Sequence, residues 1–115
     1  MDKNSKQEQE HQARVERLKE NVFSPQDVED ICKVFYLLSD PNRFKIVEAL
    51  SHGALCVYHL AEVCEGTMSN VSHQLRVLRD NKIVKARRCG KNVEYSIADM
   101  HIQKIVEMGI EHLKC

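Results

Sequence analysis

The sequence predicts a mainly α-helical domain with a small β-hairpin, arranged as a winged helix-turn-helix. Apolar residues recur at intervals of three and four through most of the chain, which is the period of an amphipathic helix. Between residues 83 and 97 the pattern changes to alternation around a turn centred on Gly90, which is typical of two paired strands. Two short helices separated by Gly66 come just before this hairpin, as in a helix-turn-helix.

Length and composition indicate a single domain. The chain has 115 residues, and its 17 Lys and Arg residues balance 17 Asp and Glu residues. No apolar run reaches the roughly 18 residues of a membrane span, and the polar N-terminus lacks the apolar core of a secretory signal. We therefore expect a cytoplasmic protein without membrane contact. The five cysteines are odd in number and irregularly spaced, which favours thiols or metal ligands over disulfides.

Local signals place each element in turn. Residues 1–20 form a polar, partly flexible arm whose end has apolar residues at helical spacing, and residues 21–115 form the folded domain. Helices are expected to begin after caps at Ser24, Asp40 and Thr67. A short helix is expected over 55–65, two strands flank a turn over 88–92, and a final helix covers 98–115. The flanking helices carry more apolar surface than so small a core can bury, so we expect a homodimer formed through the N- and C-terminal helices.

The second helix of the pair and the hairpin concentrate basic charge. Between Ser72 and Lys91 there are seven basic residues and one acid, Asp80. This concentration in a neutral chain is the electrostatic signature of phosphate binding, and short polar side chains at a helix start can bond to base edges. A solvated charged face, or a protein-interaction module that does not read DNA, is the alternative. The DNA-binding residues predicted for a palindromic double-stranded operator are Ser69, Asn70, Ser72, His73, Gln74, Arg76, Arg79, Arg87, Arg88 and Lys91.

Four side chains that can bind a metal lie in the last predicted helix: Asp99, His101, His112 and Cys115. His101 and His112 share one face but are separated by about 16 Å along the helix axis, whereas metal–ligand bonds are about 2.0–2.3 Å long. One helix therefore cannot close the site, but two antiparallel copies can, with the first pair of one chain meeting the second pair of the other. The alternative is that Asp99 caps the helix and His112 complements its dipole.

A second, weaker metal site would combine Cys56 and His59, three residues apart, with His11 from the N-terminal arm. The alternative is that Cys56 is a small core residue and that His59 faces solvent. A metal-dependent hydrolase built on the four ligands of the last helix is disfavoured, because four protein ligands leave no open position for water. We therefore expect no enzymatic activity.

Three segments resemble the ArsR/SmtB family of metal-sensing repressors, over about residues 30–115. They are LSDPNR (38–43), LCVYHLA (55–61) and SNVSHQLRVL (69–78), and the family's terminal Asp-x-His-x10-His-x-x-ligand pattern also matches. The likeness is to zinc sensors with ligands on the last helix, and it implies Asp99, His101, His112 and Cys115 as the Zn(II) ligands. A thiolate at Cys115 would also favour Cd(II) or Co(II).

The resemblance further implies a repressor that binds operator DNA without metal and is released or weakened when metal binds at the inter-subunit site. Tyr58 stands where the family's other site has its second Cys, so the arsenic- and cadmium-type ligand set is incomplete here. A repressor of the same fold that senses thiol chemistry through Cys56, Cys64 or Cys115 is the alternative function.

Overall fold

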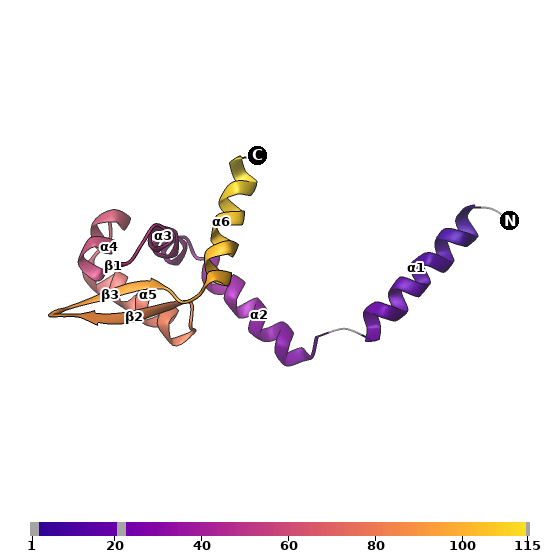
Figure 1. The fold of residues 1–115 in the computed structure, drawn as a ribbon, viewed down its shortest axis with the longest axis horizontal. Helices are drawn as coiled ribbons and strands as arrows, with labels where there is room; N and C mark the ends of the chain where they lie inside the picture. Colours follow the sequence, from indigo (N-terminus) through magenta and orange to yellow (C-terminus); the bar gives the residue numbers. More distant parts are fainter. Residues whose placement is uncertain (1–2, 21–22, 115) are drawn as a thin grey trace. The chain divides into compact units, whose positions relative to one another are not determined.

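The computed structural model describes residues 3–20 and 23–114, with side chains described from Ser5 onward. The chain divides into two units, residues 1–32 and 33–115, and each is described by itself. The elements are α1 (Lys3–Glu20), α2 (Pro25–Leu38), α3 (Pro41–Leu50), β1 (Leu55–Cys56), α4 (Val57–Cys64), α5 (Met68–Asp80), β2 (Val84–Cys89), β3 (Asn92–Ile97) and α6 (Met100–Lys114), as Figure 1 shows.

The first unit contains α1 and the beginning of α2. Helix α1 begins at Lys3, well before the apolar spacing at its end that indicated a helix. Its Gln, Glu, Lys and Arg residues favour helix intrinsically, and pairs such as Gln12 with Glu16, 2.8 Å apart, support successive turns. Helix α2 begins as predicted: the Ser24 hydroxyl accepts a hydrogen bond from the backbone N–H of Asp27 at 3.1 Å.

The predicted caps of α3 and α5 are confirmed in the second unit. Asp40 caps α3 by accepting from the backbone N–H of Arg43 at 3.0 Å, and Pro41 occupies the first turn. Thr67 caps α5 by accepting from the backbone N–H of Asn70 at 3.1 Å. Each cap satisfies a backbone donor that has no partner inside its own helix. The local sequence therefore fixes where both helices begin.

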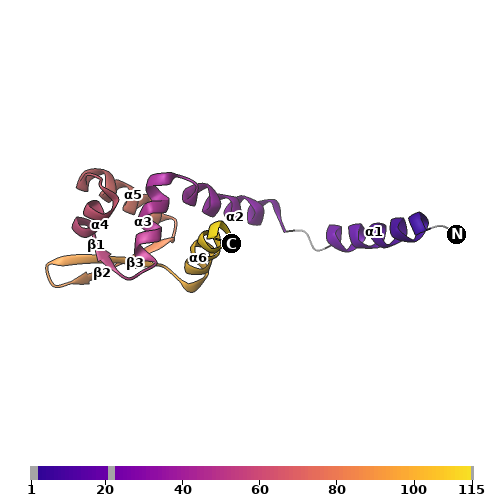
Figure 2. The same ribbon diagram turned by 90° about the horizontal axis from the view of Figure 1, so that it is seen from above.

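The sheet has one strand more than predicted. Leu55 and Cys56, expected at the start of a helix, form the short strand β1, which pairs antiparallel with Tyr95 and Glu94 of β3. The strand order is β1-β3-β2. The prediction failed here because this pairing joins residues about forty positions apart, which local periodicity cannot reveal. The β2–β3 hairpin projects beyond the helices of its unit (Figures 1 and 2).

The hairpin turn is shorter than the five-residue turn predicted over 88–92. Cys89 pairs with Asn92, so only Gly90 and Lys91 connect the strands. Gly90 has φ +62°, a left-handed conformation that favours glycine. Successive residues of β2 point to opposite faces, so Lys85, Arg87 and Cys89 share the face opposite to that of Val84, Ala86 and Arg88.

The core of the second unit packs α3, α4, α5 and α6 against the sheet. Helix α5 contributes Val71, Leu75 and Leu78, each at most 3% exposed. These positions recur every three or four residues, so burial of this face turns the opposite face of α5 to solvent. The buried apolar residues are Leu37, Leu38, Ile46, Val47, Ala49, Leu50, Leu60, Ala61, Val71, Leu75, Leu78, Ile83, Val84, Ile97, Ile102 and Val106.

Large apolar side chains remain exposed on α2 and α6. On α6, Met100, Met108 and Leu113 are 67–84% exposed, and Phe35 and Tyr36 near the end of α2 are more than half exposed. Such groups are surplus to the core, as the sequence predicted. None of the helices in residues 3–20 and 23–114 is both long enough and apolar enough to cross a membrane.

The Asp40 cap provides a test of this fold. Asp40→Ala leaves an N–H of the first turn of α3 without its partner, so we expect a loss of about 1 kcal/mol in the free energy of unfolding. Asp40→Asn retains a capping oxygen and is the matched control, expected within a few tenths of a kcal/mol of the wild type. Urea unfolding at one fixed protein concentration measures both. Equal stability of the two variants would contradict the assignment of the cap.

Candidate DNA-reading surface and metal ligands

The predicted reading face of α5 is open to solvent. Six of its seven predicted DNA-binding residues are exposed, and the exception is Gln74, which is half-buried. The Gln74 side chain faces α3, where its amide oxygen accepts a hydrogen bond from Arg43 Nη1 at 3.3 Å. The six exposed residues are Ser69, Asn70, Ser72, His73, Arg76 and Arg79.

A pocket of about 400 Å³ lies where the second half of α5 meets β3. It is lined by Ser72, Arg76, Arg79, Asp80 and Tyr95. The guanidinium groups and the hydroxyls of Ser72 and Tyr95 around one recess suit a phosphate oxygen, whereas the Asp80 carboxylate opposes one. Tyr95 was not among the predicted DNA-binding residues, because in the sequence it is only one of the alternating residues of a strand.

The basic residues of the hairpin fall on both of its faces. Arg88 lies on the face of Val84 and Ala86, and its Nε donates to the carbonyl oxygen of Gly90 at 3.4 Å, within the turn. Lys91 is exposed in the turn itself. Basic charge is therefore presented at the projecting end of the hairpin, where a DNA backbone can reach it.

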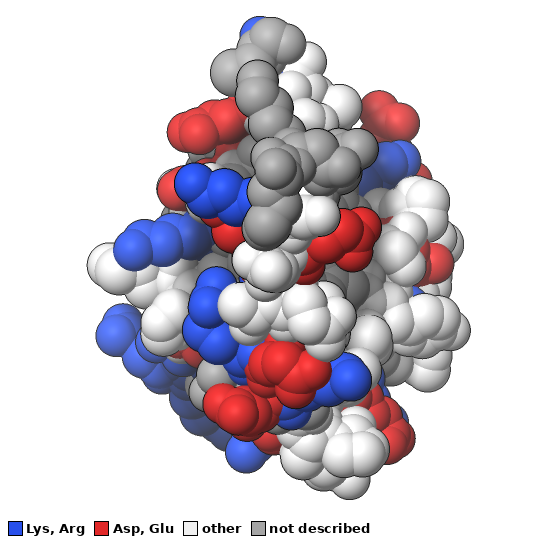
Figure 3. Space-filling model, turned by 90° about the vertical axis from the view of Figure 1, so that its right-hand side faces the viewer, with Lys and Arg blue, Asp and Glu red and all other residues white. Residues whose placement is uncertain are grey.

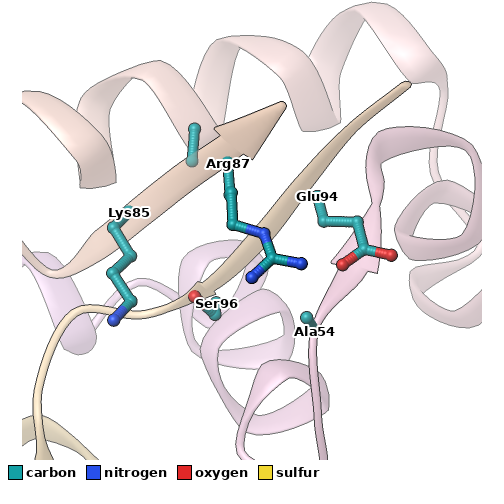
Figure 4. Close-up of a pocket in the computed structure, with 6 residues that line it drawn as sticks. Ala54, Lys85, Arg87, Glu94 and Ser96 are labelled. Atoms are coloured by element: carbon teal, nitrogen blue, oxygen red, sulfur yellow. The ribbon is translucent and has the colours of Figure 1, made fainter. Parts of the chain in front are cut away.

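The opposite face of the hairpin holds a pocket of about 520 Å³, shown in Figure 4. Lys85 and Arg87 of β2 face Ser96 and Glu94 of β3, their partners in register. The Arg87 guanidinium points towards Glu94 (Figure 4). A side-chain hydrogen bond with Cys89, and then the Glu94 carboxylate, raise the pKa of Arg87. Glu94 thus offsets part of the positive charge on this face.

Side chains of both charge signs, Lys and Arg as well as Asp and Glu, are visible on the face of the molecule in Figure 3, as expected for a chain without net charge. The excess of basic over acidic residues between Ser72 and Lys91 is therefore a local feature of α5 and the hairpin.

Two of the predicted metal ligands lie together at the start of α6. Asp99 Oδ1 accepts hydrogen bonds from the backbone N–H groups of His101 and Ile102 at 2.9 and 3.1 Å. The same oxygen lies 3.6 Å from His101 Nδ1. Asp99 is thus the N-cap of α6, as the alternative interpretation held, and it still stands beside His101. Both side chains are more than half exposed, so they are open to a ligand from another molecule.

His112, a third predicted ligand of this site, lies at the opposite end of α6 from that pair. His112 is exposed in the last turn of α6, and Cys115 lies outside the described residues. Across residues 3–20 and 23–114, no three His, Cys, Asp or Glu side chains come close enough to hold a metal ion. A single chain therefore does not assemble the site from the described residues.

The second predicted site is partly assembled. Cys56 Sγ lies 3.2 Å from His59 Nδ1, where the N-terminal turn of α4 follows β1, and Tyr58 packs edge-on against the His59 ring. Cys56 is half-buried and His59 is exposed. The third predicted ligand, His11, lies on α1 in the first unit.

The remaining cysteines differ in their surroundings. Cys32 is exposed on α2, whereas Cys64 is half-buried at the end of α4. Burial raises the pKa of the Cys64 thiol, against a smaller opposing effect of Lys45. Because thiolates rather than thiols react with oxidants, the raised pKa makes Cys64 a poor candidate for thiol sensing.

Comparison with known proteins places this geometry in a family. The model of the bacterial regulatory protein arsR family matches residues 40–86, which span α3 to β2. The chain is 38% identical over 104 residues to a transcriptional repressor SmtB homolog of Synechocystis, covering 90% of this chain and 79% of that protein. It is 40% identical to a cadmium resistance regulatory protein CadC homolog of Staphylococcus aureus, covering 89% and 84% of the two chains.

The chain belongs to the arsR family. The crystal structure of the antimony-specific transcriptional repressor AntR superposes with a TM-score of 0.74 at 29% identity, covering 82% of this chain and 86% of that one. The predicted resemblance to the ArsR/SmtB metal-sensing repressors and the predicted winged helix-turn-helix are both confirmed. This member of the arsR family is a transcriptional regulator with a DNA-binding domain, not an enzyme.

The basic end of the hairpin yields a test of DNA binding by this arsR-family protein. Each Lys or Arg that neutralises a phosphate contributes about 0.9 to the salt slope of binding, so Lys91→Gln, which removes one lysine from each subunit of the expected homodimer, is expected to lower that slope by about two. Lys104→Gln on α6 is a control of equal charge change and is expected to leave the slope unaltered. Fluorescence anisotropy of labelled duplex DNA across a salt series measures it. An unchanged slope in Lys91→Gln would remove this residue from the DNA-binding surface.

Proposed function

We propose that this protein is a homodimeric zinc-responsive repressor that binds a palindromic operator and is released or weakened when metal binds between its subunits. Four residues are the ligands: Asp99 and His101 of one chain, with His112 and Cys115 of the other. DNA is contacted by the predicted polar and basic residues of α5 and by Arg87, Arg88 and Lys91 of the hairpin. Such a regulator acts in the cytoplasm, where operator DNA is present.

The observation that carries this proposal is the placement of ligand-competent groups at both ends of α6. Asp99 and His101 are adjacent at its start, and His112 is exposed in its last turn. The intervening rise of about 16 Å is several times longer than a metal–ligand bond. A twofold axis between antiparallel α6 helices removes this gap, because it brings the start of one helix to the end of the other.

The apolar surface of α6 supports the same arrangement. Met100, Met108 and Leu113 are largely exposed in the single chain. Contact between two α6 helices would bury these side chains, at roughly 25 cal/mol for each Å² of apolar surface removed from water. The contact that forms the dimer and the contact that forms the metal site would then be the same.

The relatives support metal as the effector. The Staphylococcus aureus relative is named for cadmium resistance and the superposed AntR for antimony. Carboxylate and imidazole ligands suit zinc, while a thiolate from Cys115 would extend the range to Cd(II) and Co(II). Cys56 and His59 are two ligands of a second site, which His11 of the arm would complete.

Regulation requires that metal prefers the conformation with poor DNA affinity. The coupling free energy is typically about 1–3 kcal/mol, equal to a change of roughly fivefold to 150-fold in affinity. A metal that joins the two α6 helices would fix the angle between the subunits. The two α5 helices would then no longer match successive turns of the major groove.

The direct test measures operator affinity with and without zinc. We expect Zn(II) to lower affinity for a palindromic duplex by tenfold or more, and His101→Ala to abolish the effect while retaining affinity in the absence of zinc. His52→Ala is the matched control, because His52 is an exposed histidine outside the predicted sites and its variant should respond normally. A zinc-insensitive affinity that falls with peroxide would instead establish the thiol-sensing alternative.

A mixed dimer tests whether the site spans two chains. One chain carries Asp99→Ala with His101→Ala, the other carries His112→Ala with Cys115→Ser, and two affinity tags isolate the heterodimer. We expect one zinc at the α6 site in the heterodimer and none there in either parent homodimer. A site within one chain predicts no zinc in the heterodimer. Zinc retained by both parents, and lost on Cys56→Ser, would report the second site.

A further inference from the structure

The Arg43 side chain joins three helices of the second unit. From α3, its Nε donates to the backbone carbonyl of Leu37 in the last turn of α2 at 2.9 Å. Its Nη1 donates to the amide oxygen of Gln74 on α5 at 3.3 Å. Its guanidinium carbon lies 5.9 Å from the centre of the Tyr36 ring. One half-buried side chain thus contacts the end of α2 and the reading helix together.

The contact with Leu37 has a structural explanation. The last carbonyls of a helix lack partners within it, and a cation near a helix C-terminus is favourable. Nearby, the backbone N–H of Ser39 satisfies the carbonyls of Phe35 and Tyr36, and Arg43 satisfies the one that follows. This half of the interaction completes the C-terminal end of α2.

The hydrogen bond from Arg43 to Gln74 on α5 is not needed to complete the end of α2. An amide side chain has an accepting oxygen and a donating nitrogen, whereas a guanidinium only donates. Arg43 can therefore bond only to the oxygen, which fixes the orientation of the amide and leaves its NH₂ group as the end not bound to Arg43. The neighbouring residues Ser72 and His73 are exposed on the same helix, so Gln74 borders the reading face.

We propose that Arg43 is a positioning residue for DNA reading, which holds the Gln74 amide so that its NH₂ group donates to a hydrogen-bond acceptor of the operator. This inference rests on the proposed reading of DNA by α5. The acceptor is a base-edge atom, such as a purine N7 or a guanine or thymine carbonyl oxygen. Because Arg43 also bonds to the carbonyl of Leu37, the orientation of the Gln74 amide depends on the position of the end of α2.

The experiment compares Arg43→Lys, Gln74→Ala and the double variant by their affinities for the operator and for a scrambled duplex. Each single variant removes one specific contact in each subunit of the dimer, so it is expected to reduce the ratio of these affinities by about a hundredfold, or about tenfold for each half-site. Because both act through the Gln74 amide, the double variant should lose no more than Gln74→Ala alone. Losses that multiply, or equal losses on both duplexes, would overturn the proposal.

Gln74→Glu separates positioning from folding. Its carboxylate accepts from Arg43 in a charge-assisted bond, so we expect thermal stability at least equal to that of the wild type, but it has no NH₂ group to donate. The operator-to-scrambled ratio should fall as it does in Gln74→Ala, because repulsion of phosphates affects both duplexes alike. An unchanged ratio would overturn the proposal, even if Arg43→Lys proved unstable.

Two modified operators identify the acceptor. Loss of the wild-type advantage over Gln74→Ala on exchanging one base pair assigns the base edge that accepts the hydrogen bond. Loss only on methylphosphonate substitution at one position would assign a phosphate oxygen instead and would overturn the proposal. Retention of the advantage on every modified duplex would overturn the proposal. If the wild type itself shows no preference for a palindrome, the proposed function fails as well. If the wild type binds the operator and responds to zinc but the variants leave specificity unchanged, this inference is refuted and the proposed function is not.

Discussion

Burial of one face of α5 is the interaction on which the DNA-binding surface depends. Val71, Leu75 and Leu78 are almost completely enclosed by the core, and their spacing leaves α5 no freedom to rotate about its axis. The exposed residues between them, Ser72, His73 and Arg76, are therefore turned outward by the same packing that holds the helix. Folding and DNA reading are in this sense specified together, because a rotation that hid the reading face would also expose the core residues.

A second constraint comes from the fixed rise of the α-helix. The distance between His101 and His112 is set by the eleven residues that separate them, and no change of side-chain rotamer closes about 16 Å. Groups that are too distant within one chain can still meet across a symmetry axis. In the proposed dimer, the exposed methionines and Leu113 of α6 would gain a partner from the same symmetry. Dimerisation and effector binding would then both depend on this one helix.

The sequence could predict those features that local patterns encode. The caps at Ser24, Asp40 and Thr67 were all located correctly, because a cap requires only a polar side chain three residues before its donor. The face of α5 that packs in the core likewise follows from the helical spacing of its apolar residues alone. Strand β1 was missed because its two residues depend on pairing with β3, far along the chain.

The bond between Arg43 and Gln74 was missed for a related reason. The period of α5 placed Gln74 among the polar residues, but nothing within the helix shows that its oxygen faces α3. Arg43 in turn followed a predicted cap and had no other signal. Whether a polar residue on a helix faces solvent or a neighbouring helix is decided by the crossing of the two helices, which a single sequence does not display.

Asp99 shows how one side chain can link the effector site to the core. Its Oδ1 already accepts from the N–H groups of His101 and Ile102, and Ile102 is buried in the core. The carboxylate is therefore held in place before any metal arrives, and its second oxygen can bind metal without loss of the cap. If metal displaced the cap instead, the cost would be about 1 kcal/mol in each subunit, or at most a roughly thirtyfold change in DNA affinity for the two subunits of the proposed dimer. A larger response must therefore arise from contacts between subunits, and by linkage the operator then weakens metal binding by the same factor.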